Sequence, residues 1–342
     1  MTTTIADVAD LEDRLSEPSP GAVETLRRLD GDIVLLGAGG KMGPTLARMA
    51  RRASDLAGVR RRVLGVSRFG DQRLVDSLNA HGVETLRCDL LDEAQLERLP
   101  DAPNVIFMTG MKFGSTGQPW LTWAVNVFLP GMVCRKYRKS RIVAFSTGNV
   151  YPLTPVSAGG SKEDDAPGPV GEYAQTALGR ERMFEHFSRV HGIPVVLLRL
   201  NYAAELRYGV VSDVARKVWA GEPVDLTMGY VNVIWQGDAN AMSLQAFNHC
   251  ASLPAVINIA GPEVLSVRQL AEEFGRRLAK PVTFRGAEAP DALLSDGRRG
   301  HQLFGQPRVP APQLVEWVAD WVRRGGASLD KPTHFETRDG TF

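Results

Sequence analysis

The chain has 342 residues, with 40 Lys and Arg against 39 Asp and Glu, so its formal net charge is +1. This balance excludes a protein that holds nucleic acid mainly by electrostatic attraction, and we expect no nucleic-acid partner. With 44% hydrophobic and 23% charged residues the composition is that of a globular protein. It excludes a disordered or fibrous chain.

The three cysteines, Cys88, Cys134 and Cys250, are odd in number and lack the spacing of a metal site. They predict neither a disulfide framework nor bound metal, and they favour a reducing compartment. The first residues are acidic where a signal peptide would be basic and then apolar, and no apolar run approaches ~18 residues. We therefore expect a cytoplasmic protein with no membrane contact.

In chain order, residues 1–30 are polar and predict an N-terminal extension that includes a short amphipathic piece, Val23 to Leu29. From Asp32 onward, short apolar runs alternate with helical stretches. Near-continuous apolar strands separated by helices are typical of a parallel sheet covered on both faces. The expected strands are Ile33 to Leu36, Val63 to Val66, Val105 to Met108, Ile142 to Phe145, Val195 to Leu198 and Ala255 to Ile259.

The helical stretches begin after the first strand and continue to the C-terminus. Pro130-Gly131 is expected to kink or split the helix that contains it. After Asn201 the alternation becomes less regular, which predicts a nucleotide-binding domain over 31–201, joined by strand 255–260, and a smaller C-terminal substrate lobe built from 202–254 and 261–342. The expected helices are Pro44 to Ala53, Leu121 to Tyr137, Tyr173 to Val190, Val210 to Ala220, Ala239 to Asn248, Val267 to Leu278 and Pro312 to Arg323.

A glycine-rich turn joins the first strand to the first helix of this alternation. Glycines at three-residue spacing let a strand turn tightly, let backbone N–H groups approach a pyrophosphate, and let the next helix pack closely. The position between a strand and a helix predicts a Rossmann-type dinucleotide site, although a purely structural turn has the same composition. The turn contributes Gly37, Gly39, Gly40, Lys41, Met42 and Gly43.

The ends of the next two strands bear on the choice of cofactor. The second strand ends in Ser67 and Arg68, where an NAD enzyme carries an acidic residue for the ribose. A guanidinium suits a 2′-phosphate, so we expect NADP or NAD with a lean toward NADP, the alternative being that Arg68 is an ordinary surface residue. Asp89 and Leu90 follow the third strand and are expected near adenine. Asp92 equally predicts a helix N-cap.

Several further motifs occur in the order found in one family. The fourth strand is followed by Gly110-Met111-Lys112, Asn126-Val127 lies in the next helix, and Ser146-Thr147-Gly148-Asn149-Val150-Tyr151 ends the fifth strand. From about Ile33 to the C-terminal region the chain resembles the extended short-chain dehydrogenase/reductase superfamily, in particular its NAD-dependent epimerase/dehydratase family. The resemblance implies an α/β fold with a Rossmann-type doubly wound parallel sheet.

The resemblance also assigns roles to these residues. It places Gly110 and Lys112 near the cofactor, adds Asn126 to the cofactor site, and gives Thr147 the place of the catalytic serine or threonine. Ser146 and Asn149 are then expected beside the substrate. Tyr173, at the start of a helix, takes the place of the catalytic tyrosine and also touches the cofactor.

One position departs from the family pattern. The family carries a lysine four residues after the tyrosine, on the same face of the helix, where it holds the nicotinamide ribose and assists ionisation of the phenol. Here that position is Ala177. An unassisted phenol titrates near ~10 and is a poor base at neutral pH.

Three explanations of Ala177 stay open. A different cation takes over, either Arg180, seven residues after Tyr173 on nearly the same face, or Lys112. Alternatively the chemistry has changed to an elimination or proton abstraction of the lyase or dehydratase kind. In the third explanation catalysis is lost, and the chain is an inactive NAD(P)-binding protein with a regulatory role.

The segment after the sixth strand bears on the substrate. Arg199-Leu200-Asn201 resembles the family motif that leads into the substrate lobe, and Asn201 is the expected substrate contact, with a strand-end cap as the alternative. The chain lacks the arginine that binds a nucleotide diphosphate in sugar-nucleotide enzymes, so we expect a small sugar, polyol or sugar-acid substrate. Residues that could contact its phosphate or carboxylate, or stack on its ring, are Arg207, Arg216 and Lys217, and Trp219, Tyr230 and Trp235.

Together these observations predict an NAD(P)-dependent oxidoreductase or epimerase-like enzyme that acts at a hydroxyl-bearing carbon. Tyr173 takes the hydroxyl proton and Thr147 holds the same oxygen. The family often forms homodimers through two long helices, and here those helices are Trp120 to Tyr137 and the one that begins at Tyr173. The tail from Lys331 to Phe342 is expected to pack on the body or on a partner subunit.

Overall fold

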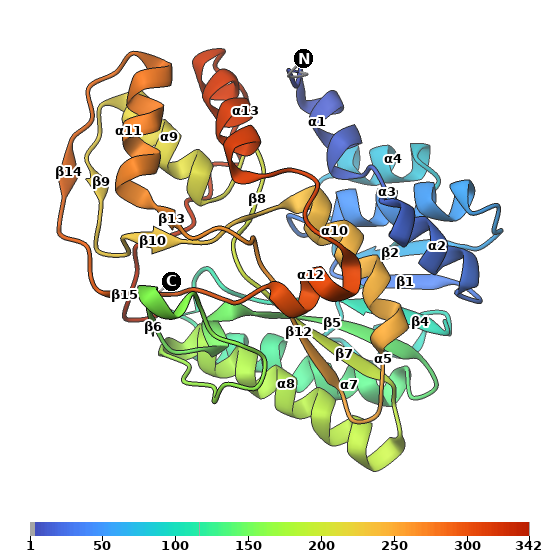
Figure 1. The fold of residues 1–342 in the computed structure, drawn as a ribbon. Coiled ribbons are helices and arrows are strands. Elements are labelled where there is room, and N and C mark those ends of the chain that lie inside the picture. Colours follow the sequence, from blue (N-terminus) through green and yellow to red (C-terminus); the bar gives the residue numbers. More distant parts are fainter. Residues whose placement is uncertain (1–3, 116, 342) are drawn as a thin grey trace.

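A computed structural model of the protein describes residues 4–115 and 117–341. At its centre lies a seven-stranded sheet in the order β12-β7-β5-β4-β1-β2-β3, and all its neighbouring strands are parallel (Figure 1). This confirms the predicted doubly wound Rossmann-type α/β fold. The strands are β1 (Ile33–Leu36), β2 (Val63–Ser67), β3 (Glu84–Arg87), β4 (Asn104–Phe107), β5 (Arg141–Thr147), β7 (Val195–Leu200) and β12 (Ala255–Ile259).

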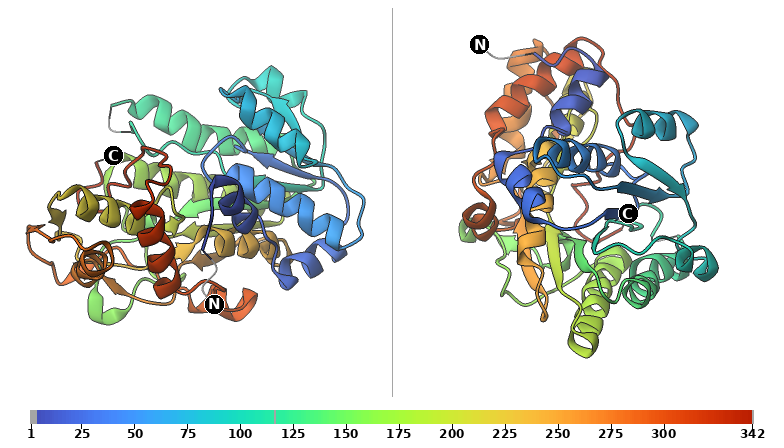
Figure 2. Two further views of the ribbon diagram at one scale, coloured as in Figure 1. Left: turned by 90° about the horizontal axis from the view of Figure 1, so that it is seen from above. Right: turned by 90° about the vertical axis from the view of Figure 1, so that its right-hand side faces the viewer.

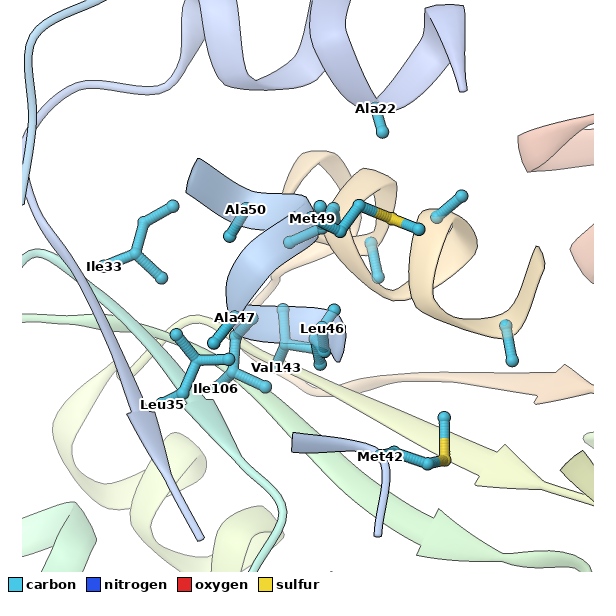
Figure 3. Packing of buried hydrophobic residues seen from close by; sticks show 14 of the residues in the cluster. Ala22, Ile33, Leu35, Met42, Leu46, Ala47, Met49, Ala50, Ile106 and Val143 are labelled. Atoms are coloured by element: carbon cyan, nitrogen blue, oxygen red, sulfur yellow. The ribbon is translucent and has the colours of Figure 1, made fainter. Parts of the chain in front are cut away.

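Both faces of the sheet are covered by helices. Successive side chains of a strand point to opposite sides of the sheet, so each strand contributes to two cores. Ile33 and Leu35 of β1 pack into one core cluster, and Val34 and Leu36 pack into another. Figure 3 shows the first cluster, in which Leu46, Ala47, Met49 and Ala50 of one helix lie over the strands. The first face is covered by α2 (Pro20–Arg28), α3 (Gly43–Leu56), α4 (Gln72–Ala80) and α10 (Gln236–Gln245), and the second by α5 (Glu93–Glu97), α7 (Leu129–Lys136) and α8 (Gly171–His191).

The helical segment before β5 is broken upstream of Pro130. It consists of α6 (Pro119–Trp123), a π-helical turn η1 (Ala124–Phe128) and α7, which has Pro130 in its first turn. Proline has no N–H for the carbonyl four residues earlier, which belongs to Asn126, and its ring crowds that carbonyl. The interruption predicted at Pro130-Gly131 therefore lies one turn closer to the N-terminus, and it includes Asn126.

The second lobe has its own apolar core. Three helices, α9 (Val210–Ala220), α11 (Val267–Leu278) and α13 (Ala311–Arg323), supply most of it. Figure 1 shows them gathered at one side of the sheet, beyond the carboxyl ends of its strands. Short strand pairs complete the lobe and its junction: β10 (Tyr230–Val231) with β13 (Leu265–Ser266), β9 (Val224–Asp225) with β14 (Phe284–Arg285), β8 (Ala203–Ala204) with β11 (Ile234–Trp235), and β6 (Thr154–Pro155) with β15 (Asp291–Ala292). The remaining elements are η2 (Gly148–Val150), η3 (Val156–Ala158), η4 (Ala246–His249) and α12 (Arg298–Phe304).

Both terminal segments of the described chain contain residues that are buried in its cores. Leu11 and Leu15 of α1 (Val8–Leu15) are buried in the core of the second lobe, whereas Leu26 of α2 is buried against α3 and α10. The two views of Figure 2 show α1 beside the last helix, α13. At the other end, Phe335 of the C-terminal tail is buried in the second lobe. No helix in the described ranges is both long enough and apolar enough to span a membrane.

Candidate functional site

The glycine-rich turn after β1 leads directly into α3, as the sequence predicts. Gly37 has a φ of +97°, a conformation that residues with a side chain rarely adopt, and a Cβ on Gly43 would lie 2.4 Å from the carbonyl oxygen of Ala38. The backbone N–H groups of Lys41 and Met42 have no acceptor in the described part of the chain. Amides at the start of a helix with no acceptor favour binding of an anion.

Two cavities meet at this turn, at the carboxyl ends of the strands. Strand β1 pairs with β2 on one side and with β4 on the other, so the strand order reverses here. Such a switch point is where open α/β sheets bind ligands. One cavity, of about 450 Å³, extends along the ends of β2 and β3, and the other, of about 270 Å³, lies between the sheet and the second lobe.

The larger cavity contains the residues predicted to hold the adenosine end of a dinucleotide. Gly39, Ser67, Arg68, Asp89 and Leu90 all line it. Arg68 is exposed and forms no ion pair with any described residue, whereas Asp89 accepts a hydrogen bond from the Leu91 N–H at 3.1 Å.

Asp92, the neighbouring acidic residue, is the N-cap of α5 and accepts from the Gln95 N–H at 3.1 Å. Its carboxylate therefore caps the N-terminus of α5.

Thr147, at the end of β5, lines the smaller cavity. Its hydroxyl oxygen accepts hydrogen bonds from the backbone N–H of Asn149 at 3.2 Å and from Asn149 Nδ2 at 3.1 Å, which caps the short helix η2. A hydroxyl has one donor and two acceptor positions. With both acceptor positions used, Thr147 has its hydrogen left to donate to a ligand oxygen.

Ser146 also lines this cavity, but its hydroxyl is committed elsewhere. It donates to Glu181 Oε1 at 2.5 Å, and Glu181 forms a buried two-point ion pair with Arg199. Arg199 in turn donates to the Tyr151 hydroxyl at 2.8 Å. This network fixes the end of β5 to α8 and β7.

Tyr173 and Arg180 of α8 both line the smaller cavity, whereas Ala177 between them does not. Ala177 is fully buried against Val150 and Tyr151. Arg180 is 5% exposed, and its guanidinium donates to the Phe145 carbonyl oxygen at 2.9 Å. The cation on this wall of the cavity is therefore Arg180, seven residues after the tyrosine.

Asn126, in the π-helical turn, joins three parts of the site. Its Oδ1 accepts from the Met111 N–H at 2.9 Å and from Arg180 Nη2 at 2.7 Å, and its Nδ2 donates to Thr176 Oγ1 at 2.9 Å. π-helical turns are frequent at functional sites. Burial lowers the pKa of Arg180, and the charges of Tyr173 and Glu181 offset part of this effect.

Asn201 is buried and lines the cavity from the end of β7. Its Nδ2 donates to Asn232 Oδ1 at 2.7 Å, and Asn232 Nδ2 donates to the carbonyl oxygens of Gly261 and Ser295. No described residue donates a hydrogen bond to the amide oxygen of Asn201. That oxygen is thus available as an acceptor for a ligand.

Two lysines reach the cavity from opposite directions. Lys41 Nζ donates to the carbonyl oxygen of Ala203 at 2.7 Å and lies 3.9 Å from the ring centre of Tyr208. Lys112 Nζ donates to the carbonyl oxygen of Thr333 in the C-terminal tail at 3.1 Å. Burial lowers the pKa of Lys41 to about 7 and that of Lys112 to about 8.

All six basic and aromatic residues predicted to contact the substrate lie outside both cavities, so this prediction is wrong. Arg207 pairs with Glu205 and Glu12, Lys217 pairs with Glu336, and Arg216 donates to the carbonyl oxygen of Ala327, shortly after α13. Trp235 belongs to the lobe core, Tyr230 packs against that core, and Lys280 lies over the Trp219 ring.

Three hydroxyl-bearing residues of the cavity wall were not found from the sequence. They are Tyr202, Tyr208 and Thr333. Two tyrosines in the segment that follows the strand-end Asn201 could have indicated the first two. The sequence around Thr333 contains no feature that indicates a place in the site. No group of His, Cys, Asp and Glu suited to a metal ion occurs in the part of the chain that the structure describes.

Comparison with known proteins identifies the family of the chain. Residues 33–253 match the model of the NAD dependent epimerase/dehydratase family. No curated protein matches the sequence.

Solved structures show the same fold at low sequence identity. The UDP-glucose 4-epimerase of Thermotoga maritima with UDP-glucose is 18% identical, with a TM-score of 0.69, over 86% of this chain and 99% of the other. The UDP-glucuronic acid 4-epimerase of Bacillus cereus with UDP-glucuronic acid and NAD is 17% identical, with a TM-score of 0.70, over 86% and 99%. The dTDP-glucose 4,6-dehydratase of Bacillus anthracis with NAD is 13% identical, with a TM-score of 0.73, over 86% and 97%. With more than half of its length matched by the family model, this chain belongs to the NAD-dependent epimerase/dehydratase family.

Proposed function

We propose that the protein is an NAD(P)-dependent oxidoreductase or epimerase-like enzyme acting at a hydroxyl-bearing carbon of a small sugar, polyol or sugar acid. The observation that carries the proposal is that Tyr173, Thr147 and Arg180 line one cavity, and that this cavity opens onto the glycine turn. A phenol, a hydroxyl donor and a cation around one space are the groups needed to remove a proton from an alcohol.

The residues present fit a dinucleotide. The unpaired amides of Lys41 and Met42 suit a diphosphate, and the cavity of about 450 Å³ beside Arg68 and Asp89 suits an adenosine. Gly110 and Lys112 line both cavities and would flank the cofactor between its two ends. When bound, a nicotinamide ring supplies reversible acceptance of hydride from a carbinol carbon.

In the proposed reaction the side chains act on one substrate oxygen. Tyr173 takes its proton, and Thr147 donates a hydrogen bond to it with the hydrogen that the cap of η2 leaves available. Arg180 supplies positive charge near the phenolic oxygen, in place of the lysine absent at Ala177. Asn201 and Asn149 orient the remaining hydroxyl groups of the substrate.

The size of the cavity supports a small substrate. Its volume of about 270 Å³ lies at the lower end of typical ligand sites. The names of the related structures include UDP- or dTDP-linked sugars. In this chain the tail residue Thr333 forms part of the cavity wall, which supports a substrate smaller than those sugars. We infer that the substrate is a free or singly substituted sugar or polyol.

Arg68 supports NADP as the cofactor. It is exposed at the mouth of the larger cavity and has no ion-pair partner among the described residues, so its guanidinium is available for a 2′-phosphate. Structures of the related fold contain NAD. Replacing Arg68 with alanine is expected to weaken NADP⁺ binding about tenfold or more and to leave NAD⁺ binding within about twofold.

The test is calorimetric titration of the purified protein with NAD⁺, NADP⁺ and their reduced forms. Micromolar binding supports the proposed cofactor site. A screen of polyols, sugars and sugar acids for reduction of the cofactor then follows, and Tyr173→Phe is expected to abolish the activity found.

Two outcomes would contradict the proposal. If no nicotinamide nucleotide binds, the remaining activity is lyase or dehydratase chemistry without hydride transfer, which is one of the explanations of Ala177. Tight binding without turnover of any substrate would favour an inactive NAD(P)-binding protein.

A further inference from the structure

The smaller cavity is lined by positive charge. Lys41, Lys112 and Arg180 line it, and no described aspartate or glutamate does. Positive groups in a partly enclosed space with low-dielectric walls attract and orient an anionic ligand.

Each of the three cations donates a hydrogen bond to the protein. Arg180 donates to Phe145 O and Asn126 Oδ1, and Lys112 donates to Thr333 O at the junction with the tail. These contacts assign Arg180 to the reacting end of the site and Lys112 to the wall closed by the tail.

Lys41 donates to one backbone carbonyl oxygen, that of Ala203, and its ammonium lies over the face of the Tyr208 ring. It makes no ion pair within the described residues. An ammonium group in a partly dehydrated place, with no carboxylate beside it, is stabilised strongly by a ligand that brings one.

The nearest carboxylates do not supply this partner, because each is already engaged. Glu205 pairs with Arg207 at 3.1 Å, and Asp213 accepts from both the N–H and the hydroxyl of Thr333. These groups lie behind the wall and not in the cavity. The place for a negative group beside Lys41 is therefore on the ligand.

The ammonium of Lys41 is also directed away from the place of a cofactor diphosphate. Its backbone N–H belongs to the glycine turn, but its side chain crosses to β8 in the segment that leads into the second lobe. The backbone of Lys41 thus suits the cofactor, whereas its ammonium faces the substrate side of the cavity.

We propose that the substrate carries a carboxylate or phosphate group and that Lys41 binds this group through its ammonium, with Tyr208 holding the ammonium toward the cavity. The inference rests on the proposed function, since it names the substrate class of the same site. It narrows the substrate from any small polyol to a sugar acid or a sugar phosphate.

The experiment compares matched ligands on the protein saturated with its nicotinamide nucleotide. Calorimetry near pH 6.5 measures D-gluconate against D-glucitol, which differ by a carboxylate, and D-glucose 6-phosphate against D-glucose, which differ by a phosphate. We expect the anionic member of at least one pair to bind at least tenfold more tightly. The pair that shows the preference identifies the anion as carboxylate or phosphate.

Lys41→Met is expected to remove that preference, to leave the neutral ligand unchanged, and to leave nucleotide affinity within about threefold. Lys139→Met is the matched control, because Lys139 is exposed just before β5, at the amino ends of the strands and away from the cavity. If Lys41→Met does not fold, the acetylation rate of Lys41 in the wild-type protein, followed by mass spectrometry, replaces it. Inorganic phosphate should then slow labelling of Lys41 and not of Lys139.

Three results would overturn the inference. The first is equal binding of the anionic and neutral members of both pairs, which includes the case in which neither binds. The second is a preference for the anion that survives Lys41→Met. The third is a large loss of nucleotide affinity in that variant, which would assign the ammonium to the cofactor. Failure of the wild-type protein to bind any nicotinamide nucleotide is a separate result and would instead contradict the proposed function.

Discussion

Arg180 Nη2 lies 2.7 Å from Asn126 Oδ1, so the cation of helix α8 is hydrogen-bonded to the π-helical turn of the neighbouring helix. The same guanidinium lies so close to Gly110 that a Cβ there would be 2.7 Å from Nη2. Arg180 is thus fixed between three elements that border the site.

The first prediction concerns this charge. Arg180→Ala is expected to lower kcat about 10²- to 10³-fold, because it removes a positive group that stabilises negative charge at the reacting oxygen. Arg180→Lys should retain part of the rate, since it keeps the charge. The measurement is steady-state kinetics on the substrate found by the screen, with thermal unfolding to verify the fold.

Arg182→Ala is the control for this prediction, because Arg182 is exposed on the same helix and pairs only with Glu185. A rate within threefold of wild type in Arg180→Ala would show that the cation is not used in the reaction.

The second prediction is that restoring the family lysine does not restore activity. Ala177 is fully buried against Val150 and Tyr151 and is absent from the cavity wall. Ala177→Lys should lower the free energy of unfolding by about 1–3 kcal/mol from overpacking alone.

Urea denaturation measures this cost, and Gln175→Lys, at an exposed position of the same helix, should stay within about 0.5 kcal/mol of wild type. A stable Ala177→Lys variant with higher activity would show that the helix can present a lysine to the site.

The third prediction concerns the buried pair of Glu181 and Arg199, whose atoms lie 2.8 Å apart. Glu181→Gln is expected to lower the free energy of unfolding by about 3–5 kcal/mol, because it leaves the Arg199 guanidinium buried without its counter-charge. Chemical denaturation gives the value. Glu185→Gln, on the solvent side of the same helix, should cost less than about 1 kcal/mol.

If Glu181→Gln and Glu185→Gln instead lower the free energy of unfolding equally, the pair of Glu181 and Arg199 is not shielded from water. Replacing Glu181 and Arg199 together by Gln and Met should recover part of the loss.

The fourth prediction is a homodimer formed through α6, η1 and α8. Trp120 and Phe128 project from this region with 71% and 59% of their surface exposed. Large apolar side chains gathered in one exposed region are typical of an interaction surface. Phe128→Glu should shift the protein to a monomer in sedimentation velocity, whereas Leu56→Glu, at an equally exposed leucine of α3, should not. A wild-type protein that sediments as a monomer would contradict this.

The fifth prediction is a pH dependence of anion binding. Burial lowers the pKa of Lys41 to about 7. Above that pH the ammonium loses its proton and an anion must bind together with one, so affinity should fall about tenfold per pH unit above 7 and level off below it. Calorimetry with gluconate or glucose 6-phosphate from pH 6 to 9 measures this.

The other charged groups facing Lys41 set the background for this profile. Glu205 and Asp213 favour the charged form, and Arg207 and Lys112 oppose it. Lys41→Met should remove both the anion preference and the step near pH 7, because it removes the group that titrates there. A profile that Lys41→Met does not change would assign the effect to another group.

The sheet and the glycine turn could be predicted from the sequence because their signals are local. Each expected strand is a continuous or nearly continuous apolar run, and Ala255–Ile259 pairs with β7 in the sheet. The short helices α4 and α5 and the strand β3, half-exposed along its length, carry weaker patterns. Tertiary packing decides such segments more than local preference does.

The π-helical turn and the tail contact have no local signature. Pro130 predicts an interruption of the helix. The sequence does not show that the interruption lies around Asn126, because its position depends on which carbonyl oxygen is left without a donor. Lys112 and Thr333 lie 221 residues apart in the chain and meet at the cavity. The direction of the Lys41 side chain likewise depends on a carbonyl 162 residues away.

The position of α1 has a consequence for how the molecule folds. Its residues share a core with α13, and Arg324 near the end of α13 donates to the carbonyl oxygen of Ile5, 319 residues earlier. Contacts between such distant parts of a chain close a very long loop, which slows folding relative to proteins built from neighbouring contacts. The core of the second lobe thus includes residues from both terminal segments, and we expect the cavity between the lobes to form late in folding.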